Sequence, residues 1–269
     1  HASRLASLLT KPGPIPMDTI ILDKQGAVAT LTLNRPDVLN ALDRQMALDL
    51  DEAVTDLSND DSIRAVVMRG AGRGFMAGGD VATMHQNIDT IDDVIRDLIG
   101  IFHKSVEGIA AMPKPVIAAV HGPVAGAGVS MSLNADYTIA ADDAKFTMAY
   151  IWLGTNPDGG STYLLPRLIG RRKALELAML SETLDAEKAL YYGIINRVVG
   201  ADELEAEAMK LATRLAAGPT KAFAQTKALI NQSFEAASFA DQLAAERDAF
   251  LSSAGTEDFA EGVAAFVEK

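Results

Sequence analysis

The pattern of apolar and polar positions alternates between two periods along the first two thirds of the chain. Residues Ala27–Leu33 alternate in the manner of a strand, and the polar segment that begins at Asn34 ends this run. From Ala41 onward the apolar residues recur at helical spacing, with charged residues between them. Strands that alternate with helices are typical of an α/β fold. Further strands are predicted at 64–69, 116–120, 137–140 and 145–148, and further helices at 92–111 and 129–134.

The pattern changes near residue 200. After a predicted strand at 194–199 the chain is helical almost throughout, with Pro219 between two helices and Gly255 before the last one. We therefore expect an α/β core over residues 17–200 and a helical C-terminal region over 201–269. Residues 1–16 begin with His and are rich in Pro and Gly toward their end, so we expect a tag remnant and linker, with Met17 as the native start.

The composition of the chain argues against several classes of function. Hydrophobic residues make up 49% and charged residues 22% of the 269 residues, an ordinary balance for a globular protein. A formal net charge of −12 argues against a nucleic-acid-binding surface, which relies on clustered Lys and Arg. The absence of Cys excludes disulfides and thiolate metal sites, and we expect no metal. No apolar run approaches the roughly 20 residues of a membrane span, so we expect a cytoplasmic protein.

Two turns of small residues carry the candidate chemistry. Met76–Asp80 contains two glycines, and Gly126-Ala127-Gly128 follows the strand that begins after Pro115. Such turns leave backbone N–H groups unpaired and let a ligand approach closely. Two of them directed at one point would form an oxyanion hole, which stabilises negative charge developing on a carbonyl oxygen.

Several segments together resemble the crotonase (enoyl-CoA hydratase/isomerase) superfamily, from about Thr19 to Lys269. The segments are Asn34-Arg35-Pro36, Leu39-Asn40-Ala41-Leu42, Ala77-Gly78-Gly79-Asp80, His121–Gly128, Leu164–Gly170 and Ala265–Lys269. The resemblance implies an α/β spiral of ββα units with a helical C-terminal trimerisation region. It also implies homotrimers or hexamers that bind acyl-CoA thioesters, with no cofactor beyond the CoA moiety of the substrate.

The resemblance also assigns site residues. The backbone N–H groups of Gly79 and Ala127 would form the oxyanion hole. Most relatives have Gly where Ala127 stands, but the N–H does the work and a methyl group leaves it in place. The residues implied in CoA binding are Val38, Ala41, Ala77, Gly79 and Val81, together with Phe266 and Lys269, which hold the CoA nucleotide, often across a subunit boundary.

The chain departs from the family pattern where hydratases carry two glutamates. Ser130 and Tyr150 stand at those two positions. Adding water across a double bond needs a base for the water and an acid for the α-carbon, normally two carboxylates. The sequence therefore disfavours straightforward hydration.

A different carboxylate stands in Asn156-Pro157-Asp158-Gly159-Gly160. Asp158 matches an acidic position of the dienoyl-CoA isomerase branch, and ring-opening isomerases of phenylacetate breakdown carry a similar Pro-Asp-Ser-Gly. Double-bond migration needs only one base, which takes a proton from the α-carbon and returns it two carbons away. An enoyl-CoA isomerase with Asp158 as acid/base is the leading hypothesis, although Asp also commonly caps such turns.

His103 leaves further alternatives open. It matches the catalytic His of 4-chlorobenzoyl-CoA dehalogenase, whose nucleophilic Asp matches Asp158. That enzyme has Trp where Tyr150 stands. Dehalogenation or thioester hydrolysis with Asp158 as nucleophile and His103 as base is therefore the second hypothesis. Overall similarity also leaves a generic enoyl-CoA hydratase open, and a non-catalytic acyl-CoA-binding protein is the third class.

Overall fold

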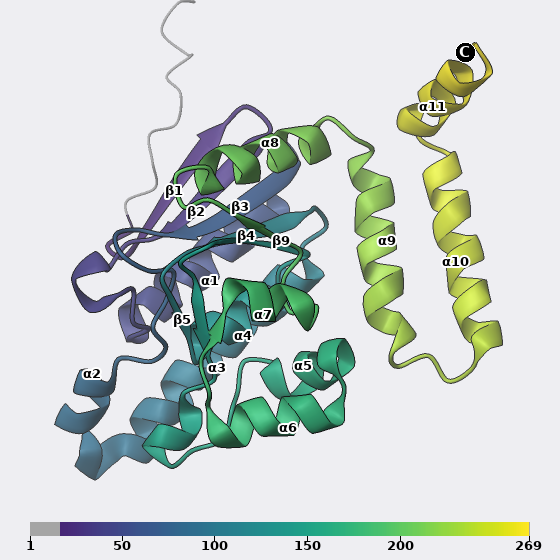
Figure 1. The fold of residues 1–269 in the computed structure, drawn as a ribbon. Helices are drawn as coiled ribbons and strands as arrows, with labels where there is room; N and C mark the ends of the chain where they lie inside the picture. Colours follow the sequence, from purple (N-terminus) through teal and green to yellow (C-terminus); the bar gives the residue numbers. More distant parts are fainter. Residues whose placement is uncertain (1–16, 269) are drawn as a thin grey trace, which may run out of the picture.

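The computed structural model describes residues 17–268, and β-sheets form its centre (Figure 1). The strands are β1 (Ile20–Gln25), β2 (Val28–Leu33), β3 (Ala65–Gly70), β4 (Val116–Val120), β5 (Pro123–Ala125), β6 (Tyr137–Ala141), β7 (Lys145–Thr147), β8 (Leu184–Asp185) and β9 (Arg197–Val199). Six of them form one sheet in the order β1-β2-β3-β4-β6-β9, parallel except for the antiparallel pair β1 and β2. The expected tag and linker over residues 1–16 lie outside the described residues.

Helices surround the sheets. They are α1 (Arg44–Asn59), α2 (Val81–Gln86), α3 (Ile91–Ala111), α4 (Ala127–Leu133), α5 (Ser161–Ile169), α6 (Arg171–Leu180), α7 (Ala186–Tyr191), α8 (Leu204–Ala216), α9 (Thr220–Ser233), α10 (Phe239–Ala254) and α11 (Glu257–Val267). In residues 17–268 no helix combines the length and the apolar character that crossing a membrane requires.

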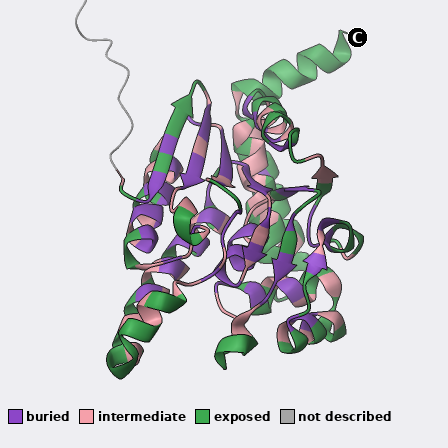
Figure 2. Cartoon of the chain, turned by 60° about the vertical axis from the view of Figure 1, so that its left-hand side comes forward, coloured by how far each residue is buried: buried purple, intermediate pink, exposed green. Residues whose placement is uncertain are grey.

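The large sheet is covered on both faces, by α1 and α3 on one side and by α8 on the other. In β3, Val66 and Met68 belong to the core cluster that includes α1 and α3, whereas Ala65 and Val67 pack with α8. Successive side chains of a strand point to opposite faces, so a parallel strand covered on both sides needs an uninterrupted apolar run. The inner strands β2, β3 and β4 are accordingly buried at nearly every position, whereas the edge strand β1 is largely exposed (Figure 2).

A smaller sheet positions the second glycine turn. Its strands follow the order β5-β7-β8, with β5 parallel to β7. Because β5 ends at Ala125 and α4 begins at Ala127, Gly126 is the single residue that joins the strand to the helix. Its backbone N–H donates to the Thr147 carbonyl at 3.0 Å, which fixes the turn on β7.

Helices α9, α10 and α11, which we call the C-terminal arm, lie beside the core (Figure 1). Lys227 on α9 anchors the arm through hydrogen bonds to the Asp136 carboxylate and the Ile109 carbonyl, both at 2.9 Å. Burial raises the pKa of Asp136 and lowers the pKa of Lys227. For both groups the loss of hydration therefore outweighs the attraction of the partner.

The structure confirms the predicted strands and helices of the core, with boundaries moved by a few residues. One difference concerns the first glycine turn, because the short helix α2 stands between it and α3. A second difference concerns α5, α6 and α7, which the hydrophobic period did not reveal. These helices are 9, 10 and 6 residues long, and each buries only two residues. So few buried positions make a weak periodic signal.

Candidate active site

The two glycine turns lie against each other. Gly78 and Gly126 both have positive φ, 101° and 50°, which glycine adopts without strain. A Cβ atom added to Gly126 would lie 3.4 Å from the Cα of Gly78. Segments far apart in the sequence therefore meet at one place.

The residues on either side of Gly79 are held by the segment before α1. Leu42 N–H donates to the Gly78 carbonyl at 2.7 Å, and Asp80 N–H donates to the Leu42 carbonyl at 2.9 Å. Gly79 N–H is not used in this pairing. In the described part of the chain, neither Gly79 N–H nor Ala127 N–H donates to a protein acceptor. The site thus offers two unpaired donors on touching turns, which is what an oxyanion hole requires.

Asp158 lies in the loop before α5, and its side chain is 19% exposed. One carboxylate oxygen, Oδ1, accepts a hydrogen bond from the Tyr150 hydroxyl at 2.7 Å, and the other, Oδ2, lies 3.3 Å from His103 Nε2. Among residues 17–268 no backbone N–H donates to this carboxylate, so Asp158 does not cap its own turn. Its carbonyl accepts hydrogen bonds from the hydroxyls of Ser130 and Ser161, both at 2.8 Å.

Ser130 and Tyr150, which stand where the family resemblance implies glutamates in hydratases, both contact Asp158. Their hydroxyl oxygens are 3.0 Å apart. Burial and the neighbouring Asp158 carboxylate raise the pKa of the Tyr150 phenol well above its ordinary value. Tyr150 is therefore a neutral hydrogen-bond donor over the whole working range of an enzyme.

One ring nitrogen of His103, Nε2, lies beside both a hydrogen-bond donor and a hydrogen-bond acceptor. Gly159 N–H donates to Nε2 at 3.3 Å, and Asp158 Oδ2 lies at the same distance from it. With its proton on Nδ1, the neutral ring accepts from Gly159 and cannot donate to an ionised Asp158. With the proton on Nε2, the ring donates to Asp158 and can no longer accept from Gly159. The position of one proton therefore decides which of the two hydrogen bonds forms.

The loop of Asp158 approaches α3 and α4 closely at Gly159, where φ is +59°. A Cβ atom there would lie 2.8 Å from the Cβ of Ser130 and 2.9 Å from a ring carbon of Phe102. Only glycine fits such a position. Gly159 thereby brings Asp158 to His103, one residue along α3 from Phe102.

Helix α4 connects the two parts of the site. Ala127 is its first residue, and Ser130 lies one turn later. Tyr150 also joins them, because a Cβ atom added to Gly126 would lie 3.9 Å from the Tyr150 ring. The acid/base candidate and the unpaired N–H groups therefore belong to one continuous site.

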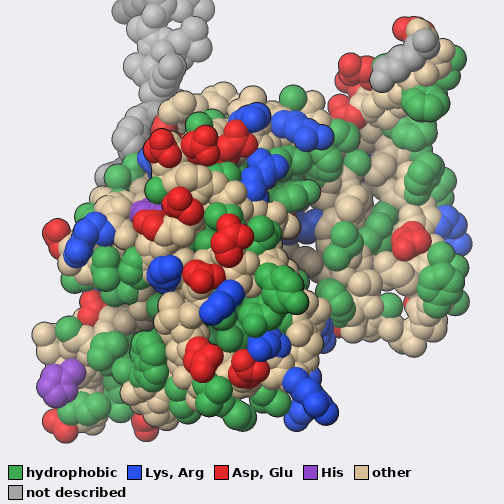
Figure 3. Space-filling model, in the orientation of Figure 1, with side chains coloured by type: hydrophobic (Ala, Val, Ile, Leu, Met, Phe, Trp, Pro, Cys, Tyr) green, Lys and Arg blue, Asp and Glu red, His purple; other side chains and the backbone are tan. Residues whose placement is uncertain are grey.

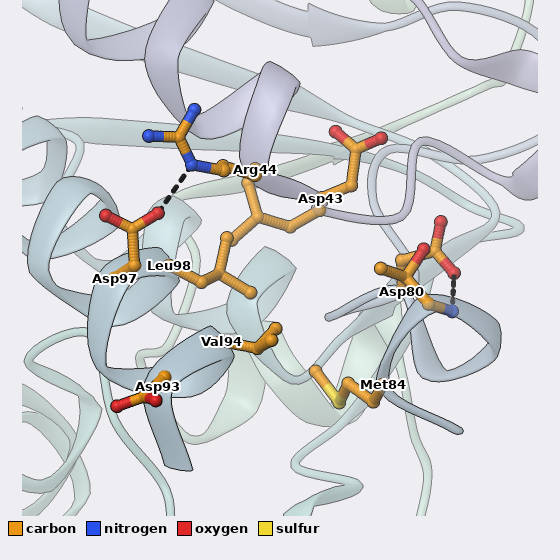
Figure 4. Close-up of a pocket in the computed structure, with 10 residues that line it drawn as sticks. Asp43, Arg44, Asp80, Met84, Asp93, Val94, Asp97 and Leu98 are labelled. Carbon is orange, nitrogen blue, oxygen red and sulfur yellow. Dashed lines mark hydrogen bonds and ion pairs between the residues drawn. The ribbon is translucent and has the colours of Figure 1, made fainter. Parts of the chain in front are cut away.

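A cavity of about 280 Å³ lies on the α1 side of the first glycine turn, between α1, α2 and α3 (Figure 4). Arg44 and Asp97 form an ion pair of 2.5 Å across one side of it. The methyl carbon of Met84 separates the cavity from Gly79, since it lies 2.6 Å from an added Cβ there. The cavity does not include Asp158. Ligand sites measure about 300–1,000 Å³, so a cavity of about 280 Å³ holds part of a substrate at most.

The residues implied in CoA binding fall into two groups. Ala41 and Ala77 lie on paired segments, where Ala77 N–H donates to the Leu39 carbonyl at 3.0 Å. Val38 and Val81 flank these segments and are 44% and 48% exposed. Phe266 lies on α11, across the molecule from α2 (Figure 1). Lys269 lies outside the described residues.

The sequence model of the family described as enoyl-CoA hydratase/isomerase matches residues 23–269. The chain belongs to this family. The 1,2-epoxyphenylacetyl-CoA isomerase of Escherichia coli K12 is 41% identical over 256 residues, covering 94% of this chain and 97% of the relative. A trans-2-decenoyl-[acyl-carrier-protein] isomerase of Streptococcus mutans is 35% identical, covering 93% of this chain and 95% of the relative.

Solved structures agree in fold. A putative enoyl-CoA hydratase from Streptomyces coelicolor has a TM-score of 0.90 at 35% identity, with 97% of this chain and 96% of that chain covered. An enoyl-CoA hydratase from Polaromonas has a TM-score of 0.88 at 36% identity, with 93% and 96% covered. The crotonase fold and the family resemblance are confirmed, and the protein is an acyl-CoA-processing enzyme of this family.

Proposed function

We propose that this enzyme shifts a double bond in an enoyl-CoA thioester by proton transfer through Asp158. The single observation that carries the proposal is the surroundings of Asp158. One carboxylate faces His103 and is bound by Tyr150, whose ring lies beside the turn that precedes the unpaired Ala127 N–H. In the same site the two hydratase glutamates are replaced by Ser130 and Tyr150.

The backbone N–H groups and the Asp158 carboxylate have separate roles in this reaction. Gly79 N–H and Ala127 N–H bind the thioester oxygen and stabilise the enolate that forms when the α-proton leaves. Asp158 takes that proton on Oδ2, because Oδ1 accepts the Tyr150 hydroxyl. It then returns the proton to the γ-carbon, and the double bond moves from the β,γ to the α,β position. One carboxylate serves both steps, so no second acid/base group is required.

Hydration is less well supported. A hydratase must hold a water molecule with one carboxylate while another group protonates the α-carbon. Here the hydroxyl of Tyr150 donates to the Asp158 carboxylate, and the hydroxyl of Ser130 donates to the Asp158 carbonyl. Neither group is available as a base.

A second candidate substrate is 1,2-epoxyphenylacetyl-CoA. The relative with that name is 41% identical over 94% of this chain. The Pro157-Asp158 segment, which resembles the Pro-Asp-Ser-Gly of such ring-opening isomerases, supports the same assignment. This substrate would also be a CoA thioester that is isomerised without gain or loss of atoms.

A panel of CoA thioesters tests the reaction type. It contains 3-enoyl, 2-enoyl, 3,5-dienoyl, 1,2-epoxyphenylacetyl and 4-chlorobenzoyl thioesters, and the products are separated by chromatography. We expect isomerisation of a 3-enoyl, dienoyl or epoxide substrate. Dominant hydration of 2-enoyl-CoA would overturn the proposal. Release of chloride or free CoA would favour the hydrolytic alternative, and binding without turnover a non-catalytic role.

We also propose that the enzyme forms homotrimers or hexamers through the C-terminal arm. The arm exposes large apolar side chains in the single chain (Figure 3). Among them are Phe239, Phe250, Leu251, Phe266 and Val267, each at least 64% exposed. Sedimentation at micromolar concentration should give a trimer or a multiple of it, and a stable monomer would contradict this arrangement.

A further inference from the structure

The segment before α1 and the segment after β3 run side by side next to the first glycine turn. Their backbones share three hydrogen bonds, donated by Ala77, Leu42 and Asp80 at 3.0, 2.7 and 2.9 Å. These bonds hold the residues around Gly79 but not the Gly79 N–H itself. The direction of that N–H is therefore fixed by how firmly the two segments are joined.

The Arg35 side chain joins the same two segments. Its guanidinium donates to the Ala41 carbonyl and lies 3.1 Å from the Asp43 carboxylate and 3.0 Å from the Asp80 carboxylate. These partners lie on both sides of the pairing. The exposed fractions of the three side chains are only 21%, 22% and 11%, so solvent screens the contacts partially at most.

The two carboxylates are also helix caps. Asp43 Oδ1 accepts the Met46 N–H at the start of α1, and Asp80 Oδ1 accepts the Thr83 N–H at the start of α2. Each carboxylate thus uses one oxygen for a helix and the other for Arg35. Figure 4 shows Asp43 and Asp80 on the same side of the cavity, opposite the Arg44–Asp97 pair. The planar fork of an arginine can serve several acceptors at once, whereas the single ammonium of a lysine cannot hold them in this geometry.

We propose that Arg35 is a positioning residue for the oxyanion hole, which fixes Gly79 N–H relative to Ala127 N–H by clamping the two helix caps. The inference rests on the proposed function of these N–H groups. Asp80 is the residue directly after Gly79, so any movement of its carboxylate is transmitted to the donor within one peptide unit. A displacement of about 1 Å in such a group lowers turnover by about 100-fold.

The test compares Arg35→Lys and Arg35→Gln with Arg64→Gln. Arg64 is a matched control, because its guanidinium also joins distant segments through the Thr220 hydroxyl and the Gly218 carbonyl, away from the site. The readout is the carbonyl stretching frequency of butyryl-CoA labelled with ¹³C at the thioester carbon, measured bound to each protein. Thermal unfolding and separate values of kcat and KM accompany it.

In the wild type, binding should lower the carbonyl frequency, because the two N–H groups polarise the bond. Both Arg35 variants should lose most of this shift and about 10- to 100-fold in kcat, with a smaller change in KM. Arg64→Gln should retain both values even if its melting temperature falls as far. Added guanidinium ion should restore part of the turnover of Arg35→Ala and leave the turnover of Arg64→Ala unchanged.

Different results would contradict the oxyanion hole and the positioning role of Arg35. A wild-type protein that binds butyryl-CoA with no frequency shift would remove the oxyanion hole and with it the proposed function. A full wild-type shift in folded Arg35→Lys and Arg35→Gln would overturn the positioning role alone. Equal losses of the shift in the Arg35 and Arg64 variants would also overturn it, because they would show a general loss of structure.

Discussion

The two parts of the candidate site are built from different material. The oxyanion part consists of backbone N–H groups on two glycine turns, held by backbone hydrogen bonds from neighbouring segments. The acid/base part consists of side chains: Asp158, Tyr150, His103 and Ser130 come from a loop, a 3-10 turn and two helices. The first part depends on the path of the chain and the second on the identity of single residues.

This difference explains why one fold supports several reactions. A backbone donor tolerates a change of side chain, and Ala127 illustrates this because its methyl group does not affect its N–H. The side-chain part can exchange two glutamates for Ser130 and Tyr150 while the turns stay in place. Chemistry can therefore change without disturbing the binding of the thioester oxygen. A substitution in the side-chain part should therefore change the chemistry, whereas the backbone part should be affected only when an N–H group is removed or displaced.

The largest effect is expected for Asp158→Asn. The amide keeps the size of the side chain and still accepts the Tyr150 hydrogen bond, but it cannot take a proton. Positioned acid/base groups contribute about 10²–10⁴-fold, so isomerase turnover should fall by that order while the affinity for the substrate changes little. Steady-state kinetics and calorimetric titration with a CoA thioester check both values. Near-normal turnover would remove Asp158 from the mechanism.

The sequence predicted the path of the chain through the backbone part of the candidate site. Small residues after a strand are local signals, and strand, turn and helix follow one another at Val116–Leu133 as expected. Both Gly79 and Ala127 were assigned to this part from the sequence. What the sequence could not show is that the turns touch, because that depends on the pairing of strands far apart in the chain.

The side-chain part was predicted less completely. The sequence indicates Asp158 and His103 separately as candidates. The distance of 3.3 Å between Asp158 Oδ2 and His103 Nε2 follows from the close approach of Gly159 to α4, and no local sequence pattern predicts that approach. Arg35 was noted only as part of a motif, since its partners at Asp43 and Asp80 lie 8 and 45 positions away in the chain. Residues that act through such contacts become visible only in the fold.

The second largest effect is expected for Ala127→Pro, which removes one N–H group from the backbone part of the site. Ala127 is the first residue of α4, a position that favours Pro because its N–H has no helical partner. The helix should therefore persist while the donor is lost. Loss of one oxyanion donor lowers kcat by about 10²–10³-fold. Circular dichroism and melting serve as the control for folding, and unchanged turnover in a folded variant would exclude this N–H from the site.

A smaller effect is expected for Tyr150→Phe, which removes the hydrogen bond to Asp158 Oδ1 but no proton carrier. A hydrogen bond to a charged group is worth about 1.5 kcal/mol or more, so kcat should fall about tenfold. The folded state raises the pKa of Tyr150, so its contribution to stability is present below pH about 10 and is lost as pH rises above that value. Denaturant unfolding at several alkaline pH values should therefore show a flatter loss of stability in the variant. The same alkaline slope in both proteins would contradict this account of Tyr150.

The smallest effect on isomerisation is expected for His103→Gln, and this substitution separates the two chemistries of the side-chain part. The Gln amide carries both a donor and an acceptor, so it can satisfy Asp158 Oδ2 and Gly159 N–H at the same time, which one histidine nitrogen cannot do. An isomerase should therefore change by no more than about threefold, because both original contacts are long and weak. A hydrolytic enzyme would instead lose the base that activates water and accumulate a covalent adduct on Asp158. The adduct would be an aryl ester after loss of chloride from 4-chlorobenzoyl-CoA, or an acid anhydride after loss of CoA from a thioester. Mass spectrometry of the intact protein after brief exposure to 4-chlorobenzoyl-CoA and to a 3-enoyl-CoA distinguishes these results. Unmodified protein with nearly full isomerase turnover is the expected outcome, whereas an adduct that maps to Asp158 would replace proton transfer by covalent catalysis in this site.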